Sequence, residues 1–74
     1  MDEKRYAIFE LRGTGQGGWD ICGIVTKFAP STDKQSLEEV CHKMNKYKPN
    51  SWVDFCIYEI NEKDEPMCHG KVIK

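Results

Sequence analysis

Two segments near the N-terminus have the residue pattern of β-strands. Residues 6–12 are rich in aromatic and β-branched side chains and end at the glycine cluster of residues 13–18. Residues 19–28 are again strand-like, so the two segments predict a hairpin with a long glycine-rich tip. Gly23 lies inside the second segment, where a glycine is typical of a β-bulge.

The middle of the chain predicts one amphipathic helix. After a turn at residues 29–32, apolar residues recur at the spacing i, i+3, i+4, i+7 and i+10, at Leu37, Val40, Cys41, Met44 and Tyr47. Capping-box patterns at residues 32–35 and 36–39 place the start of the helix between residues 32 and 37. Pro49 sets its end, because proline cannot continue a helix.

The remainder of the chain predicts a second hairpin. Residues 51–60 alternate as a third strand, the polar residues 61–66 form a solvated loop, and residues 67–74 form a weaker fourth strand. The order ββαββ therefore predicts one α+β domain over residues 1–74, a four-stranded antiparallel sheet with one helix packed on one face. A right-handed crossover gives the strand order 2-1-3-4, and the order 1-2-3-4 remains open.

Period-two alternation divides the strand residues between the two faces of this sheet. The face under the helix is predicted to hold Phe9, Leu11, Ile24, Val53, Phe55 and Ile57. The opposite face is predicted to hold Tyr6, Ile8, Ile21, Trp52, Cys56 and Tyr58. A slip of one residue would exchange the two sets on a strand. An uncovered aromatic face usually marks an interaction surface, and the alternatives are loops folded over it or two subunits pairing their faces.

Composition narrows the class of protein. With 74 residues, of which 39% are hydrophobic, the chain can build a single core, and a domain of this size buries only about 60% of its unfolded surface. Cys22, Cys41 and Cys56 lie in apolar segments and the N-terminus lacks a signal-peptide pattern, so we expect buried free thiols and a cytoplasmic protein. Without disulfides, binding to a partner or dimerisation is expected to cover the remaining apolar surface.

The patterns that resemble catalytic or metal-binding motifs lack the required context. The G-x-G-x-x-G match at residues 13–18 leads into a strand, whereas a dinucleotide site needs a helix there. The adjacent pairs at residues 41–42 and 68–69 each place cysteine and histidine side chains in different directions, which disfavours a zinc site or a Cys-His nucleophile. We therefore expect no catalytic residue, metal or cofactor, and a protein that is not an enzyme.

Two hypotheses of function follow. The first is a small non-enzymatic protein-binding module, such as an inhibitor, adaptor or accessory factor, whose small size fits an origin in a phage or other mobile element. Its partner would be another protein or a second copy of the chain, bound through Trp19, Trp52, Tyr58, Tyr6, Ile8, Gly15 and Gly17. The second is a nucleic-acid-binding protein that uses the basic end of the helix, with Lys43, Lys46, Tyr47 and Lys48. The net charge of the chain favours neither hypothesis, since 11 basic and 12 acidic residues nearly cancel. No membrane contact is expected.

Overall fold

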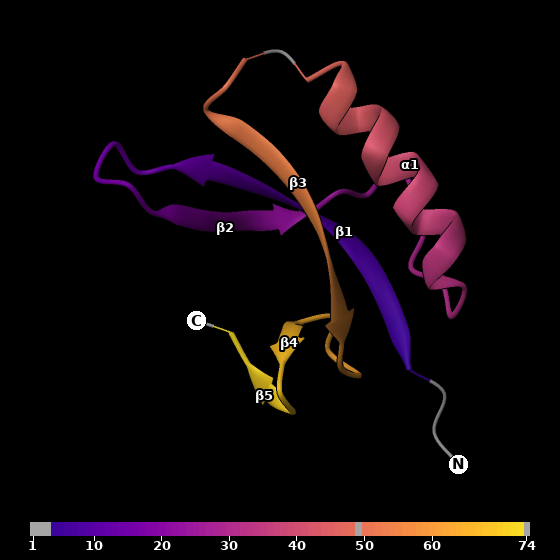
Figure 1. Ribbon diagram of the computed structural model, residues 1–74. Helices are drawn as coiled ribbons and strands as arrows, with labels where there is room; N and C mark the ends of the chain where they lie inside the picture. The colour runs from indigo at the N-terminus through magenta and orange to yellow at the C-terminus, as the bar shows by residue number, and fades with distance from the viewer. Residues whose placement is uncertain (1–3, 49, 74) are drawn as a thin grey trace.

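A computed structural model describes residues 4–48 and 50–73 (Figure 1). Its elements are β1 (Arg5–Gly13), β2 (Trp19–Ile24), α1 (Lys34–Lys46), β3 (Val53–Ile60), β4 (Pro66–Cys68) and β5 (Lys71–Val72). They form an α+β fold with one antiparallel sheet in the order β2-β1-β3-β4-β5. The predicted strand order is confirmed, but the sheet has five strands and not four. The predicted fourth strand is divided by a turn at His69 and Gly70, which both have positive φ.

The helix begins within the predicted interval but with a different cap. Asp33 is the N-cap, and its carboxylate accepts hydrogen bonds from the Ser36 backbone N–H at 3.3 Å and the Ser36 hydroxyl at 2.8 Å. These bonds favour the charged form and lower the pKa of Asp33. At the other end, the N–H of Tyr47 bonds to the carbonyl of Lys43. Tyr47 is 77% exposed, so its predicted place on the apolar face of the helix is wrong.

The β1 side chains that pack under the helix are not the predicted ones but those of the opposite face of the strand. Ile8 is 1% exposed and packs with Leu37 and Cys41 of the helix. The register Ile8↔Ile57 places Ile57 on the same face, as predicted for β3. Tyr6 and Ile8 therefore lie under the helix, and their predicted place on the opposite face is wrong. Alternation did not reveal this, because Glu10 and Arg12 share a side with Tyr6 and Ile8 and make that side read as the polar one.

The second face of the sheet holds a small core of its own. Ala7, Phe9 and Ile60 are buried there, and the rings of Phe9 and Tyr58 meet edge to face at 5.7 Å between centroids. In Figure 1 the strands β4 and β5 turn away from the helix, and the end of the chain returns below β2. Ile73 accordingly lines the same cavity as Trp19. The expectation of an uncovered face is thus wrong around Phe9, which is buried against Ile21, Ile24 and Tyr58 of the neighbouring strands.

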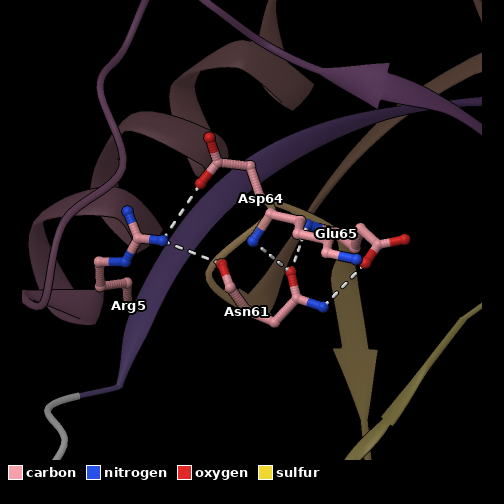
Figure 2. A network of polar contacts seen from close by, with 5 residues as sticks. Arg5, Asn61, Asp64 and Glu65 are labelled. Carbon is pink, nitrogen blue, oxygen red and sulfur yellow. Dashed lines mark hydrogen bonds and ion pairs between the residues drawn. The ribbon is translucent and has the colours of Figure 1, made fainter.

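Two local devices hold this arrangement. The side-chain amide of Asn45 lies along the edge of β3, where it accepts from the Phe55 N–H and donates to the Phe55 carbonyl, both at 2.9 Å. Cys41 also donates to that carbonyl, at 3.2 Å. At the other end of the sheet, Arg5 donates to the Asn61 carbonyl at 2.9 Å and to the Asp64 carboxylate at 3.2 Å, which joins β1 to the β3–β4 turn (Figure 2). The predicted polar loop is therefore an ordered turn.

Candidate binding cleft at the glycine tip

The loop between β1 and β2 is held in shape by short-range hydrogen bonds. Thr14 N–H donates to the Gly18 carbonyl at 3.1 Å, and Gln16 N–H donates to the Thr14 hydroxyl at 3.2 Å. Gly15 and Gly17 have φ values of +82° and +84°, which other residues rarely adopt. The glycine tip is therefore a specific turn whose conformation depends on its sequence.

Two tryptophans reach the base of this tip, Trp19 from β2 and Trp52 from the position immediately before β3. Trp19 is the register partner of Gly13, and on the other side the Gly13 N–H donates to the Trp52 carbonyl at 2.8 Å. Paired residues on neighbouring strands project to the same face, so Trp19 lies with Gly13 on the face away from the helix. A Cβ added to Gly13 would lie 3.1 Å from Cε3 of Trp52, so this indole rests directly on the glycine.

Both indoles line one cavity of about 330 Å³, which we call the tryptophan cleft. Trp19 is 48% exposed and Trp52 is 61% exposed. The described residues that line the cleft carry no charge, and they are Gly13, Gly15, Gly17, Gly18, Trp19, Ser51 and Trp52. The cleft thus presents aromatic surface to solvent with no side chain of the fold covering either indole fully.

A second cavity of about 390 Å³ continues from the cleft along the same face and shares Trp19 with it. We call it the acidic groove, because the Asp54 carboxylate lies on this face and no basic residue is among the described lining residues, which are Leu11, Trp19, Asp20, Ile21, Asp54, Cys56, Tyr58 and Ile73. Asp20 is the register partner of Arg12, so its side chain is directed to the opposite face of the sheet. Asp54 is the register partner of Leu11 on this face. Its carboxylate has a single ion-pair partner in the described part of the chain, Lys48 at 3.8 Å.

The structure brings together most of the side chains predicted for a partner-binding surface. Trp19, Trp52, Gly15 and Gly17 line the tryptophan cleft, and Tyr58 lines the acidic groove. Tyr6 and Ile8 are on the other side of the sheet, packed against the helix. Sequence reasoning missed the lining residues Gly13, Ser51, Leu11, Asp54 and Ile73. Gly13 carried a signal, since a glycine at the end of a strand often marks a close approach of other groups.

The basic residues of the alternative hypothesis form a separate and smaller cluster at the end of the helix. The ammonium group of Lys46 lies 5.6 Å from the ring centroid of Tyr47, and Lys43 is exposed. Lys48 is directed to Asp54, and its side chain is 30% exposed. No lysine is among the described residues that line the cleft or the groove, and Lys48 reaches the groove only through its ion pair with Asp54.

The four cysteines are free thiols. Burial, with smaller contributions from Cys56 and Asp54, raises the pKa of Cys41 to about 11, and burial beside Asp54 raises the pKa of Cys56. Both thiols are therefore protonated at neutral pH and are poor nucleophiles. Cys22 was expected to be buried but is exposed, because it is the extra residue of a bulge between Gly23 and Ile21, which confirms the bulge predicted at Gly23.

The cysteine–histidine pairs remain apart from any cluster. Within residues 4–48 and 50–73, no three His, Cys, Asp or Glu side chains come close enough together to hold a metal ion. The helix of the described chain is too short and too polar to span a membrane. Comparison of the chain with protein-family models, with curated proteins and with solved structures finds no match to any of them.

Proposed function

We propose that this chain is a small non-enzymatic protein-binding module that holds its partner at the tryptophan cleft and the acidic groove. The observation that carries the proposal is the pair of tryptophans that line one cavity beside Gly13, Trp52 against the glycine and Trp19 in register with it, while about half of each residue stays open to solvent. Tryptophan is among the residues that dominate binding energy at interfaces, particularly where it sits in a pocket next to apolar neighbours.

The exposed surface of the two tryptophans is large enough to matter for binding. A tryptophan offers up to about 250 Å², so exposed fractions of 48% and 61% leave roughly 270 Å² for the pair. At about 25 cal/mol per Å², covering that surface contributes roughly 7 kcal/mol before the costs of association are subtracted. Neighbouring contacts at Leu11, Tyr58 and Ile73 would add to this value.

In this role the chain would act as an inhibitor, adaptor or accessory factor. The experiment is affinity capture from extracts of the cells that produce the protein, with the double variant Trp19→Ala/Trp52→Ala compared with the wild type. We expect the double variant to lose the partner by at least about tenfold, as two truncated anchor residues imply. Tyr47→Ala is the matched control, because Tyr47 is an exposed aromatic residue outside the cleft.

Three results of the same experiment are informative. Equal capture by the wild type and the double variant would refute the proposal. Partner binding that falls steeply between low and moderate salt, and that depends on Lys43 and Lys46, would support the nucleic-acid hypothesis instead, since phosphate contacts release counterions. Light scattering of the purified chain would reveal whether the bound partner is a second copy, in which case the double variant should be monomeric.

A further inference from the structure

The tryptophan cleft selects against anionic ligands. Its seven described lining residues are four glycines, two tryptophans and one serine. Such a lining offers no side chain to neutralise a phosphate or to pair with an ion, and an unpaired charge placed there would lose its hydration without compensation. Aromatic faces instead attract flat or ring-shaped apolar groups. The cleft therefore suits an uncharged ring held against indole surface.

The same cleft also offers hydrogen-bond donors. Among the hydrogen bonds of the described residues, neither the indole N–H of Trp19 nor that of Trp52 has an acceptor. A ligand that brings carbonyl groups and few N–H donors would satisfy them without burying donors of its own. A polyproline II segment has these properties, because its backbone makes no internal hydrogen bonds and proline lacks an N–H. Such a segment is also rigid before binding, which reduces the entropic cost.

The acidic groove adds a preference in charge. Asp54 projects into it, and no basic residue is among its described lining residues. The Asp54 side chain is 37% exposed, and its ion pair with Lys48 joins two partly solvated groups at 3.8 Å. Such a pair contributes little free energy, so a cation of the partner can compete with Lys48 for this carboxylate. The groove therefore favours a basic side chain of the partner, lying against Trp19 and near Asp54.

The spacing of the two cavities matches a short peptide. Gly13 lines the cleft and Leu11 lines the groove, and two strand residues cover about 7 Å. A polyproline II chain rises about 3.1 Å per residue, so this distance corresponds to two or three residues. Resting on the proposed function, we propose that the partner presents an extended proline-containing segment, with a proline ring in the tryptophan cleft and an arginine or lysine two or three residues away in the acidic groove.

The test is a titration of the ¹⁵N-labelled full chain with defined peptides, followed through the two indole N–H resonances. The probe is a decaproline with one arginine near its end. We expect it to shift both resonances with a dissociation constant below about 1 mM. The same peptide with glutamate in place of arginine should bind at least about threefold more weakly, as expected for the loss of partly exposed charge pairs. A glycine–serine peptide with the same arginine should shift neither resonance.

Variants assign the binding to the two cavities. Trp19→Ala and Trp52→Ala should each weaken decaproline binding by at least about tenfold, whereas Tyr47→Ala should leave it unchanged. Asp54→Asn should remove the difference between the arginine and glutamate peptides without abolishing proline binding. Retention of the wild-type ¹⁵N spectrum away from the cleft would show that each variant is folded.

The result that overturns this inference is distinguishable from failure of the proposed function. If the arginine decaproline shifts neither indole while cellular capture still requires Trp19 and Trp52, the protein-binding role stands and the proline segment is wrong. If both the peptide and the capture are indifferent to the two tryptophans, both proposals are wrong. Stronger shifts with a thymidine decanucleotide than with the peptide would overturn the inference in favour of base stacking.

Discussion

Replacement of Asn45 by alanine is expected to destabilise the fold more than replacement of any exposed polar residue of the same helix, because Asn45 is half-buried against β3. Its amide forms two hydrogen bonds of 2.9 Å to the backbone of Phe55, at the edge of β3. Alanine removes both, although the Phe55 carbonyl keeps its contact with the Cys41 thiol at 3.2 Å. The Phe55 N–H is then left without a protein partner at a half-buried position.

The expected loss can be worked out from these bonds. Each hydrogen bond contributes about 0.5–1.5 kcal/mol net, and a buried donor left unsatisfied costs about 1–3 kcal/mol. We therefore expect Asn45→Ala to lower the free energy of unfolding by about 2 kcal/mol. For a chain of 74 residues, total stability is about 4–11 kcal/mol, and the melting temperature should fall by about 8–16 °C.

Urea denaturation and amide hydrogen exchange at Phe55 provide the measurements. His42→Ala is the matched control, because His42 is exposed on the same helix, and its effect should stay within about 0.5 kcal/mol. Asn45→Asp should give an intermediate loss, since a carboxylate can accept from the Phe55 N–H but cannot donate to its carbonyl. A loss below about 0.5 kcal/mol for Asn45→Ala, with unchanged exchange at Phe55, would refute the idea that this side chain closes the edge of β3.

Three further predictions concern the cleft, a thiol and the helix cap. Gly13→Ala places a Cβ 3.1 Å from Cε3 of Trp52, so the indole must move. We expect the free energy of unfolding to change by less than about 1 kcal/mol. Decaproline binding, measured in the indole titration, should weaken about fivefold. Burial is the main reason that the pKa of Cys41 is raised to about 11. Iodoacetamide at pH 8 should therefore modify the exposed Cys68 long before Cys41, and peptide mass mapping would measure the order of modification. The hydrogen bonds from Ser36 lower the pKa of Asp33 in the folded state. The charged Asp33 carboxylate therefore stabilises the fold at pH values above about 4, the ordinary pKa of a carboxyl group, and this stabilisation is lost as the pH falls. In urea denaturation, the stability advantage of the wild type over Asp33→Asn should shrink below about pH 4.

Each of these predictions has a matched control and a contrary outcome. Gly18→Ala adds a Cβ that meets only the Thr14 hydroxyl, at 3.4 Å, so it should affect the indole of Trp52 less than Gly13→Ala. Peptide binding unchanged by Gly13→Ala would show that the position of this indole is unimportant. Equal alkylation of Cys41 and Cys68 in the native protein would mean that the helix opens readily. A constant difference between wild type and Asp33→Asn across the acid range would remove the charge effect at the cap.

The sequence predicted the elements of this fold better than their faces. The helix and the first three strands are long periodic segments, and the strand order 2-1-3-4 followed from the handedness of the crossover. The face assignment of β1 failed because the two polar residues of the strand, Glu10 and Arg12, share a side with Tyr6 and Ile8. Alternation therefore favours the side of Phe9 and Leu11 as the core under the helix, whereas Tyr6 and Ile8 pack there. The turn that divides the last strand depends on the left-handed conformation of His69, which residue type alone does not specify.

The candidate site was predictable in its members and not in its shape. Trp19, Trp52 and the glycine tip stand out as exposed aromatic and turn-forming residues near strand ends. Their position in one cavity beside Gly13 requires the registers of both the β1–β2 and β1–β3 pairs, and the second pair joins segments about forty residues apart in the chain. The acidic groove requires, in addition, that the C-terminal strands return to bring Ile73 beside Trp19.

The position of Ile73 in the wall of the acidic groove determines where the protein can be labelled or joined to another molecule. β1 is nine residues long, about 30 Å at 3.3 Å per residue, and Arg5 and Gly13 stand at its opposite ends. An affinity tag or fluorophore attached ahead of Arg5 would therefore begin a full strand length from the two indoles. The same attachment made just after Ile73 would start beside Trp19 and would compete with whatever docks there, so immobilisation through the N-terminal side is the geometry that leaves the docking face free.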